Sequence, residues 1–203
     1  MTPLRPGDVI AFADGDTRDL VAIAENFVSD GIQAVTHSPL THVAMVWAFD
    51  FPINGAPQRE LYIIESTIRN GVNGVQLNPL AQRLGEAKRV AGLLLSARVR
   101  AFLDFNAMWH LGAAKLGDRY DVAEIGAYLA RHIPILEEIP ALYQPTAGAE
   151  VCSELVAMLL RAGGLPGLRP ATMPPQAIAE LRIYEEQIPL AGDPIVIPNF
   201  NTV

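Results

Sequence analysis

The spacing of apolar residues divides this 203-residue chain into strand-like and helix-like stretches, and this division limits the fold classes that the chain can adopt. Short apolar runs typical of strands cover residues 7–12, 42–50 and 60–67, and residues 71–77 and 89–96 could add two more. One stretch with helical spacing, residues 19–35, lies between the first two runs. The Pro- and Gly-containing segment 51–59 reads as a loop, so we expect the strands on either side of it to pair antiparallel.

Helical spacing dominates after residue 100. Residues 100–117 predict one helix ending at Gly117, and residues 121–133 predict another that Asp121 caps. A further apolar helix begins near Cys152 and ends at Gly163 and Gly164. We expect a short helix after Pro174 and an edge strand at residues 184–190. The pattern indicates one α+β domain over residues 1–203, an antiparallel sheet packed against helices, with a proline-rich C-terminal extension from about residue 182.

Charge and composition narrow the function classes. The chain has 15 Lys and Arg against 22 Asp and Glu, a formal charge of -7, and no basic stripe, so we expect no nucleic-acid partner. Charges interrupt every apolar run before it reaches the length of a membrane span. The amino terminus lacks the pattern of a secretory signal, which predicts a cytoplasmic protein unless another route exports it. A single cysteine agrees with a reducing compartment.

That cysteine, Cys152, has two interpretations. It lies on the same side of its helix as Leu155 and Val156, where a free cysteine can simply be part of the core. It also lies in the first helical turn, where unpaired N–H groups and the helix dipole stabilise a thiolate and could hold an oxyanion. The second interpretation requires a histidine and a carboxylate.

His42 and Glu65 are the candidates for those partners. His42 begins an apolar strand, a position that can face a cleft, and Glu65 ends another apolar run, where a buried carboxylate must be paired. If the two strands are neighbours, Glu65 can orient the imidazole of His42. A strand-capping histidine and a solvated glutamate are the alternatives. We interpret His110 and His132 as packed or surface residues of helices.

Several segments, taken in order, resemble a known family. These are GDVIAF, THVAMV, IIES followed by GV, GDRYD and CSELVAMLLRAGG, which together span roughly residues 4–181. The chain is similar to circularly permuted NlpC-type papain-like proteins, the YiiX-like group related to lecithin-retinol acyltransferase. The sequence departs from that group in having Thr41 before the histidine, where serine is commoner, and in lacking the export signal of many bacterial relatives. His37 has no counterpart and is treated as a loop residue.

The resemblance implies a papain-like α+β fold in which the cysteine helix follows the sheet strands. It implies Cys152 as nucleophile, His42 as general base, Glu65 as orienting residue and Tyr120 as the tyrosine beside the nucleophile, with no metal or organic cofactor. The expected activity is a cysteine hydrolase acting on a peptide or isopeptide amide, as in peptidoglycan. Lipid acyl transfer, thioester hydrolysis and a non-catalytic binding module remain alternatives. A metal site built from His37, His42, Glu65 and Cys152 matches no standard zinc spacing.

Overall fold

The computed structural model describes residues 4–13, 39–53, 56–69, 72–119, 151–200 and 202. Its centre is a six-stranded sheet in the order β4-β3-β2-β1-β5-β6, and all neighbouring strands run antiparallel. The strands are β1 (Val9–Ala13), β2 (Leu40–Ile53), β3 (Ala56–Arg69), β4 (Val72–Pro79), β5 (Arg89–Leu95) and β6 (Tyr184–Ala191). All five predicted strand regions are confirmed, as is the predicted edge strand, β6.

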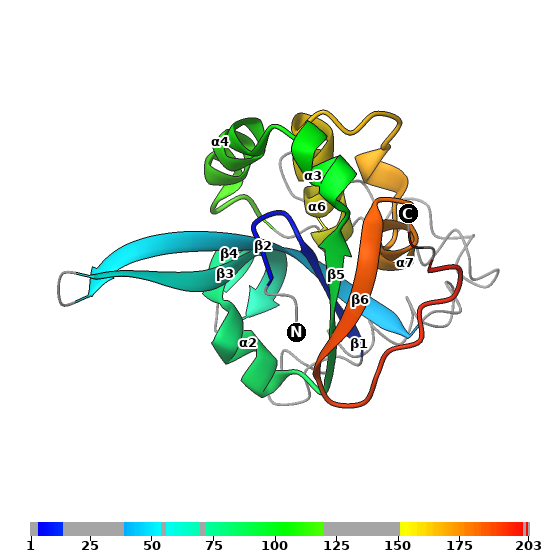
Figure 1. Cartoon of the computed structure of the whole chain (residues 1–203), viewed down its shortest axis with the longest axis horizontal. Coiled ribbons are helices and arrows are strands. Elements are labelled where there is room, and N and C mark those ends of the chain that lie inside the picture. The colour runs from blue at the N-terminus through cyan, green and yellow to red at the C-terminus, as the bar shows by residue number, and fades with distance from the viewer. Residues whose placement is uncertain are drawn as a thin grey trace, which may run out of the picture.

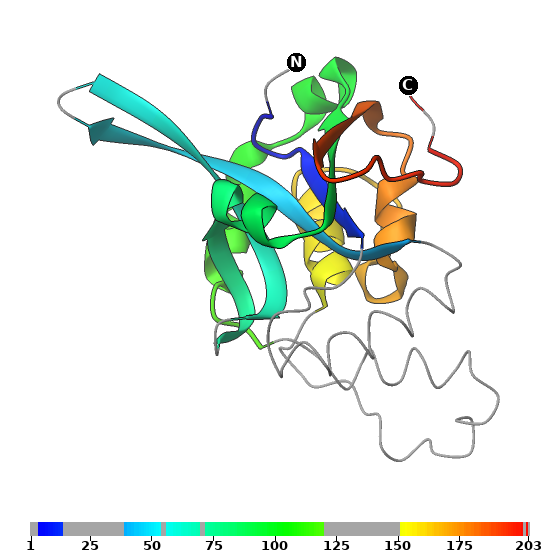
Figure 2. The same cartoon turned by 90° about the horizontal axis from the view of Figure 1, so that it is seen from below.

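Helices cover both faces of the sheet (Figures 1 and 2). They are α2 (Leu80–Glu86), α3 (Ala97–Phe102), α4 (Phe105–Lys115), α6 (Cys152–Ala162) and α7 (Pro175–Ala179), with a short 3-10 turn, η3 (Pro170–Thr172). The antiparallel α+β architecture is therefore confirmed. The predicted helices at residues 19–35 and 121–133 lie outside the described residues.

Alternation along the strands divides the core into two clusters, one on each face. On β2, Met45 and Trp47 belong to the larger cluster with α4, α6 and α7, whereas Ala44 and Val46 belong to the smaller cluster with Leu80 of α2. β1 is buried along its whole length because it has a strand on either side and a cluster on either face. The two faces of the sheet are consequently distinct environments.

The prediction of one helix over residues 100–117 is wrong, because the structure has two helices there. Helix α3 ends at Phe102, and Asp104 begins α4 by accepting a hydrogen bond from the Ala107 N–H at 3.0 Å. This capping bond starts a new helix after Asp104, although the apolar spacing on which the prediction rested continues through the segment. Gly117 is the predicted stop, and its φ of +89° is the left-handed conformation that glycine adopts after a helix.

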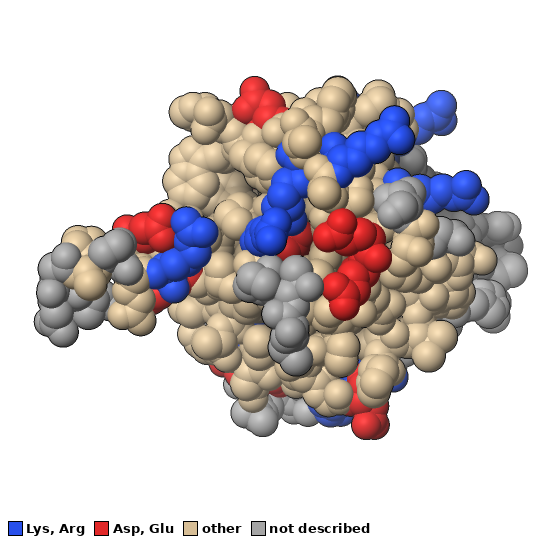
Figure 3. Space-filling view, viewed as in Figure 1, with Lys and Arg blue, Asp and Glu red and all other residues tan. Residues whose placement is uncertain are grey.

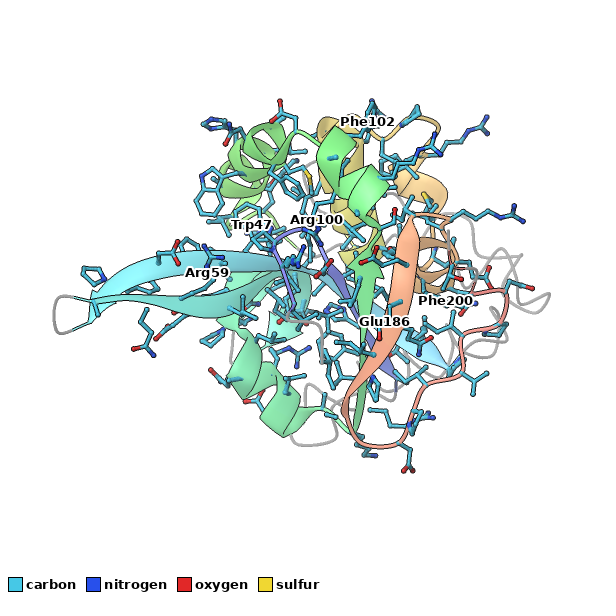
Figure 4. The ribbon with its side chains drawn as sticks, in the orientation of Figure 1. Trp47, Arg59, Arg100, Phe102, Glu186 and Phe200 are labelled. Atoms are coloured by element: carbon cyan, nitrogen blue, oxygen red, sulfur yellow. The ribbon has the colours of Figure 1, made fainter. Side chains whose placement is uncertain are left out.

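The segment 51–59, expected to be a loop, is mostly strand. Pairing of β2 with β3 continues to Ile53 and Ala56, so the two strands form a two-stranded arm that projects from the body (Figure 1). Phe49, Phe51 and Tyr62 contact one another along this arm, and Phe49 also meets Trp109 of α4. Figure 4 places Arg59 along the arm and Trp47 near its base. The contacts of Phe49 and Phe51 with Tyr62 join the two strands and favour pairing beyond the point that the Pro and Gly residues indicated.

On the face in Figure 3, a band of Lys and Arg side chains runs from the centre toward the upper right, and a smaller group of Asp and Glu side chains lies beside it. Within the described ranges, no helix is both long enough and apolar enough to cross a membrane.

Candidate active site

Helix α6 places Cys152 at its first position. Val151 precedes it in an extended conformation, with φ -86° and ψ 161°, and its side chain makes no capping hydrogen bond. The first-turn N–H groups are therefore not satisfied by a side chain of the capping residue. Leu155, Val156 and Leu159 hold the helix against the sheet and are fully buried. Cys152 is itself 4% exposed, so it lies in the core, as one of the two interpretations expected. It also lies at the end of the helix, where His42 and backbone N–H groups contact it.

The pairing between strands β2 and β3 ends where Cys152 approaches the sheet. Pairing of β2 with β3 ends at Met45 and Ile64, although β2 continues along β1 to Leu40 and β3 continues along β4 to Arg69. The next N–H of β2 on the side of β3 belongs to Val43, and this N–H donates to the Cys152 sulfur instead of to a strand. The end of the β2–β3 ladder therefore provides a place for the Cys152 side chain.

His42 connects Cys152 to a carboxylate. Its Nε2 lies 2.7 Å from Oε2 of Glu65, and its side chain also hydrogen-bonds to Cys152. Because Nε2 faces Glu65, Nδ1 is the ring nitrogen left for the sulfur. The side chain of His42 keeps 14% of its surface exposed, whereas Glu65 is completely buried. The three residues thus form a continuous line in which the partly exposed His42 connects the buried Cys152 to the completely buried Glu65.

The three side chains come from two layers, His42 and Glu65 from the sheet and Cys152 from helix α6. Glu65 and His42 follow the alternation of Ile63 and Ala44, which face α2, whereas Cys152 belongs to the helix on the opposite face. They can meet only at the end of the ladder between β2 and β3, since intact pairing would separate the two faces. The site therefore depends on where that pairing stops.

Two further residues bind the carboxylate of Glu65. Asn78 of β4 donates from Nδ2 to Oε1 at 2.8 Å, and Arg83 of α2 donates from Nη2 to Oε2 at 3.1 Å. Arg83 Nε lies 2.9 Å from Oε1, within ion-pair distance, although its N–H does not point along a hydrogen bond. Both carboxylate oxygens are therefore paired, as burial of a charge requires.

These contacts shift the pKa values in a consistent direction. Burial alone raises the pKa of the Cys152 thiol, but the positive charge and hydrogen bond of His42, with the N–H groups of Val43 and Ser153, outweigh it and lower that pKa. Burial alone lowers the pKa of His42, yet the Cys152 thiolate and then Glu65 raise it to about 9. An imidazolium–thiolate pair is the state that these shifts favour.

Glu65 remains ionised for a related reason. Burial alone raises its pKa, but the hydrogen bond from His42, the positive charges of Arg83 and His42, and the hydrogen bond from Asn78 outweigh that cost and lower it to about 2. Between about pH 2 and about pH 9 the carboxylate is thus negatively charged while His42 is protonated.

The structure brings together three of the four site residues expected from the sequence: Cys152, His42 and Glu65. Tyr120 lies outside the described residues, as do His37 and His132, and His110 is exposed on α4. Asn78 and Arg83, which bind Glu65, were not predicted from the sequence. A usable signal for Arg83 was its position three residues after Leu80 on the same side of a short helix, where a charge is unexpected.

Among the residues that the structure describes, no group of three or more His, Cys, Asp or Glu is arranged to hold a metal ion. Neither a scan against protein-family models nor a search of the curated proteins finds a match to this chain.

Proposed function

We propose that this chain is a cysteine hydrolase that cleaves an amide bond through an acyl-enzyme intermediate. The observation that supports it is the position of His42, which hydrogen-bonds to Cys152 on one side and to Glu65 on the other. A nucleophile, a base and a residue that orients the base, each within hydrogen-bond reach of the next, are the parts that covalent acyl chemistry requires.

In the first half of the reaction, the Cys152 thiolate attacks the carbonyl carbon and forms a C–S bond. The carbonyl oxygen becomes an oxyanion, which the backbone N–H of Cys152 at the start of α6 can stabilise, with Tyr120 as a further candidate donor. The C–N bond then breaks, and His42 gives its proton to the leaving amine. The product is a thioester on Cys152 and a neutral imidazole.

In the second half, His42 accepts a proton from water as the water oxygen attacks the thioester carbonyl. The C–S bond breaks, and the carboxylic acid leaves while Cys152 returns to the thiolate beside a protonated His42. Glu65 stays negatively charged throughout and holds Nε2, so that Nδ1 remains directed at the sulfur.

We further propose that the α+β domain is papain-like in the permuted NlpC-type arrangement. In support, a cysteine at the start of a helix meets a histidine on a strand of an antiparallel sheet, and the histidine precedes the cysteine in the chain. This assignment suggests a peptide or isopeptide amide as the substrate class, with peptidoglycan stem peptides as the first candidates.

The experiment offers dansylated muropeptides and acyl thioesters side by side to the full chain and to Cys152→Ser. We expect release of the amine from a muropeptide, loss of this turnover in the variant, and an acyl adduct on Cys152 by intact-mass spectrometry. Turnover of the thioesters alone would replace the amidase proposal with acyl transfer or thioester hydrolysis. Binding of either substrate without turnover would indicate a binding module.

A further inference from the structure

The series of paired side chains in the site continues beyond Glu65 to Arg83. Arg83 contacts the same carboxylate: its Nη2 shares Oε2 with His42, and its Nε lies beside Oε1. Positive and negative groups therefore alternate from Arg83 through Glu65 and His42 to Cys152. With the thiolate and the imidazolium both formed, the four charges sum to zero. All of them lie in or at the edge of the core, where an unbalanced charge is costly.

The local fold presents Arg83 to the carboxylate. Leu80 and Arg83 are the two buried residues of α2, and their spacing of three places both on the side of the helix that meets the sheet. Arg83 is 7% exposed, which is unusual for an arginine away from an interface. Its guanidinium therefore has a specific partner within the fold, and that partner is Glu65.

Phe12 packs against both Arg83 and His42. Its ring centroid lies 4.8 Å from the Arg83 guanidinium carbon and 5.3 Å from the centroid of the His42 ring. Phe12 is 3% exposed and pairs with His42 across β1 and β2. One aromatic side chain thus contacts both cationic groups that flank Glu65 and shields them from water.

We propose that Arg83 is a positioning residue of this site, which holds both oxygens of Glu65 and keeps it charged so that Glu65 can support a protonated His42 and, through it, the Cys152 thiolate. This inference rests on the proposed function. Arg83 touches neither the sulfur nor the imidazole nitrogen that faces it, so its effect passes through Glu65.

Removal of the Arg83 guanidinium would change the pH at which Glu65, His42 and Cys152 take up protons. Without Arg83, the completely buried Glu65 loses a cationic partner, and the cluster of Glu65, His42 and Cys152 carries one net negative charge. Such a cluster takes up a proton at higher pH than the neutral one, either on Glu65 or on the thiolate. A proton on the thiolate removes the reactive pair directly, and a proton on Glu65 removes the negative charge that supports the imidazolium. We therefore expect the imidazolium–thiolate pair to be lost at a higher pH than in wild type.

The test measures the rate of iodoacetamide alkylation of Cys152 against pH, with Arg83→Met, Arg83→Lys and wild type compared. We expect the acidic midpoint to move up by about one pH unit in Arg83→Met, so that alkylation below both midpoints slows by about tenfold. Arg83→Lys retains the charge but not the two-point contact, so an intermediate shift is expected. A purely structural role in docking α2 would lower the thermal midpoint of unfolding and leave the acidic midpoint where it is.

The control is Arg59→Met, which removes an exposed arginine paired with Asp50 on the arm and should leave the profile unchanged. In the Glu65→Gln background, Arg83→Met should produce no further shift, because the residue through which it acts is gone. An unchanged acidic midpoint in Arg83→Met overturns the inference; if that variant does not fold, an unchanged midpoint in Arg83→Lys does so. Ordinary titration of wild-type Cys152 overturns the proposed function instead.

Discussion

The Nε2 of His42 lies 2.7 Å from Oε2 of Glu65, although the two residues are not a backbone pair in the sheet. Pairing between their strands has ended at Met45 and Ile64, and the side chains span the space beyond that point. The same space admits the start of α6, so the contact of His42 with Glu65 and the contact of His42 with the Cys152 thiol have one structural origin.

The reactivity of Cys152 should depend on His42. In wild type, the charge of His42 outweighs the burial that alone raises the thiol pKa, so iodoacetamide should react well below the ordinary midpoint of about 8.5. In His42→Ala, we expect the midpoint to return to about 8.5 or above, because burial then acts without the cation. The assay is unambiguous because the chain has one cysteine. Identical profiles for the two proteins would contradict the pairing.

The proposed amide hydrolysis should have an alkaline limit set by His42. Its pKa is raised to about 9 by the thiolate and Glu65, against the lowering effect of burial, so His42 is protonated below that pH and neutral above it. The leaving amine needs the His42 proton, and the rate should therefore fall as the pH rises through about 9. Alkylation needs only the thiolate and should not fall there. A decline of both rates together at that pH would indicate unfolding instead.

Glu65 should make the fold sensitive to acid. Its pKa falls from 4.5 to about 2 on folding because its bonds to His42, Arg83 and Asn78 outweigh burial. A carboxyl whose pKa is depressed by folding stabilises the protein above its unfolded pKa, so this contribution is lost as the pH falls from about 4.5 to about 2. Denaturant unfolding of wild type and Glu65→Gln across this range should show the difference between them shrinking. A constant difference would contradict the assignment.

Loss of the Glu65 charge should also be costly near neutral pH. Glu65→Gln leaves the buried Arg83 without a carboxylate, and we expect the free energy of unfolding to fall by about 3–5 kcal/mol. Glu65→Gln combined with Arg83→Met removes the unpaired cation and should recover part of this loss. Urea denaturation of the two variants tests the expectation, which a further fall in the double variant would contradict.

Gly112 should be necessary for the packing of α4 on the sheet. A Cβ at this position would lie 2.6 Å from the ring of Trp47 and 3.0 Å from Ile64 Cδ1, and Trp47 is backed by Trp109 at a centroid distance of 4.2 Å. Gly112→Ala should therefore lower the free energy of unfolding, since overpacking costs about 1–3 kcal/mol and exceeds the gain in helix propensity of about 1 kcal/mol.

Gly85 is the matched control for this substitution. It lies in α2, and an added Cβ would meet no atom within 4 Å. Gly85→Ala should keep or raise the thermal midpoint, because only the helix propensity changes. Equal thermal midpoints for the two alanine variants would show that Trp47 yields to the added methyl group.

Much of this architecture is determined by local pattern. The apolar runs predict the strands, and the stripe of Leu155, Val156 and Leu159 predicts α6 with Cys152 at its start. Gly117 and Gly163 correctly mark helix ends. These features can be read from the sequence because strand alternation, helical spacing and terminal glycines each act over a few residues.

Other features depend on contacts that local pattern does not contain. The break between α3 and α4 follows from one capping bond at Asp104, and the arm is extended by contacts across strands such as Phe51 with Tyr62. Apolar spacing does not contain the capping bond, so it predicted one helix, and the Pro and Gly residues of segment 51–59 do not contain the contacts across strands, so they predicted a loop that was too long.

The amino-acid sequence alone identifies the side chains that have the chemistry for a site: one thiol at the start of a helix, a histidine at the start of a strand and a glutamate within another. That these side chains meet follows from the fold, because the end of the β2–β3 ladder lets Cys152 reach His42 from the opposite face of the sheet. The fold also brings Arg83 and Asn78 onto Glu65. A buried carboxylate must be neutralised by whatever the fold places beside it, and neighbours in space are not encoded in the spacing of one segment.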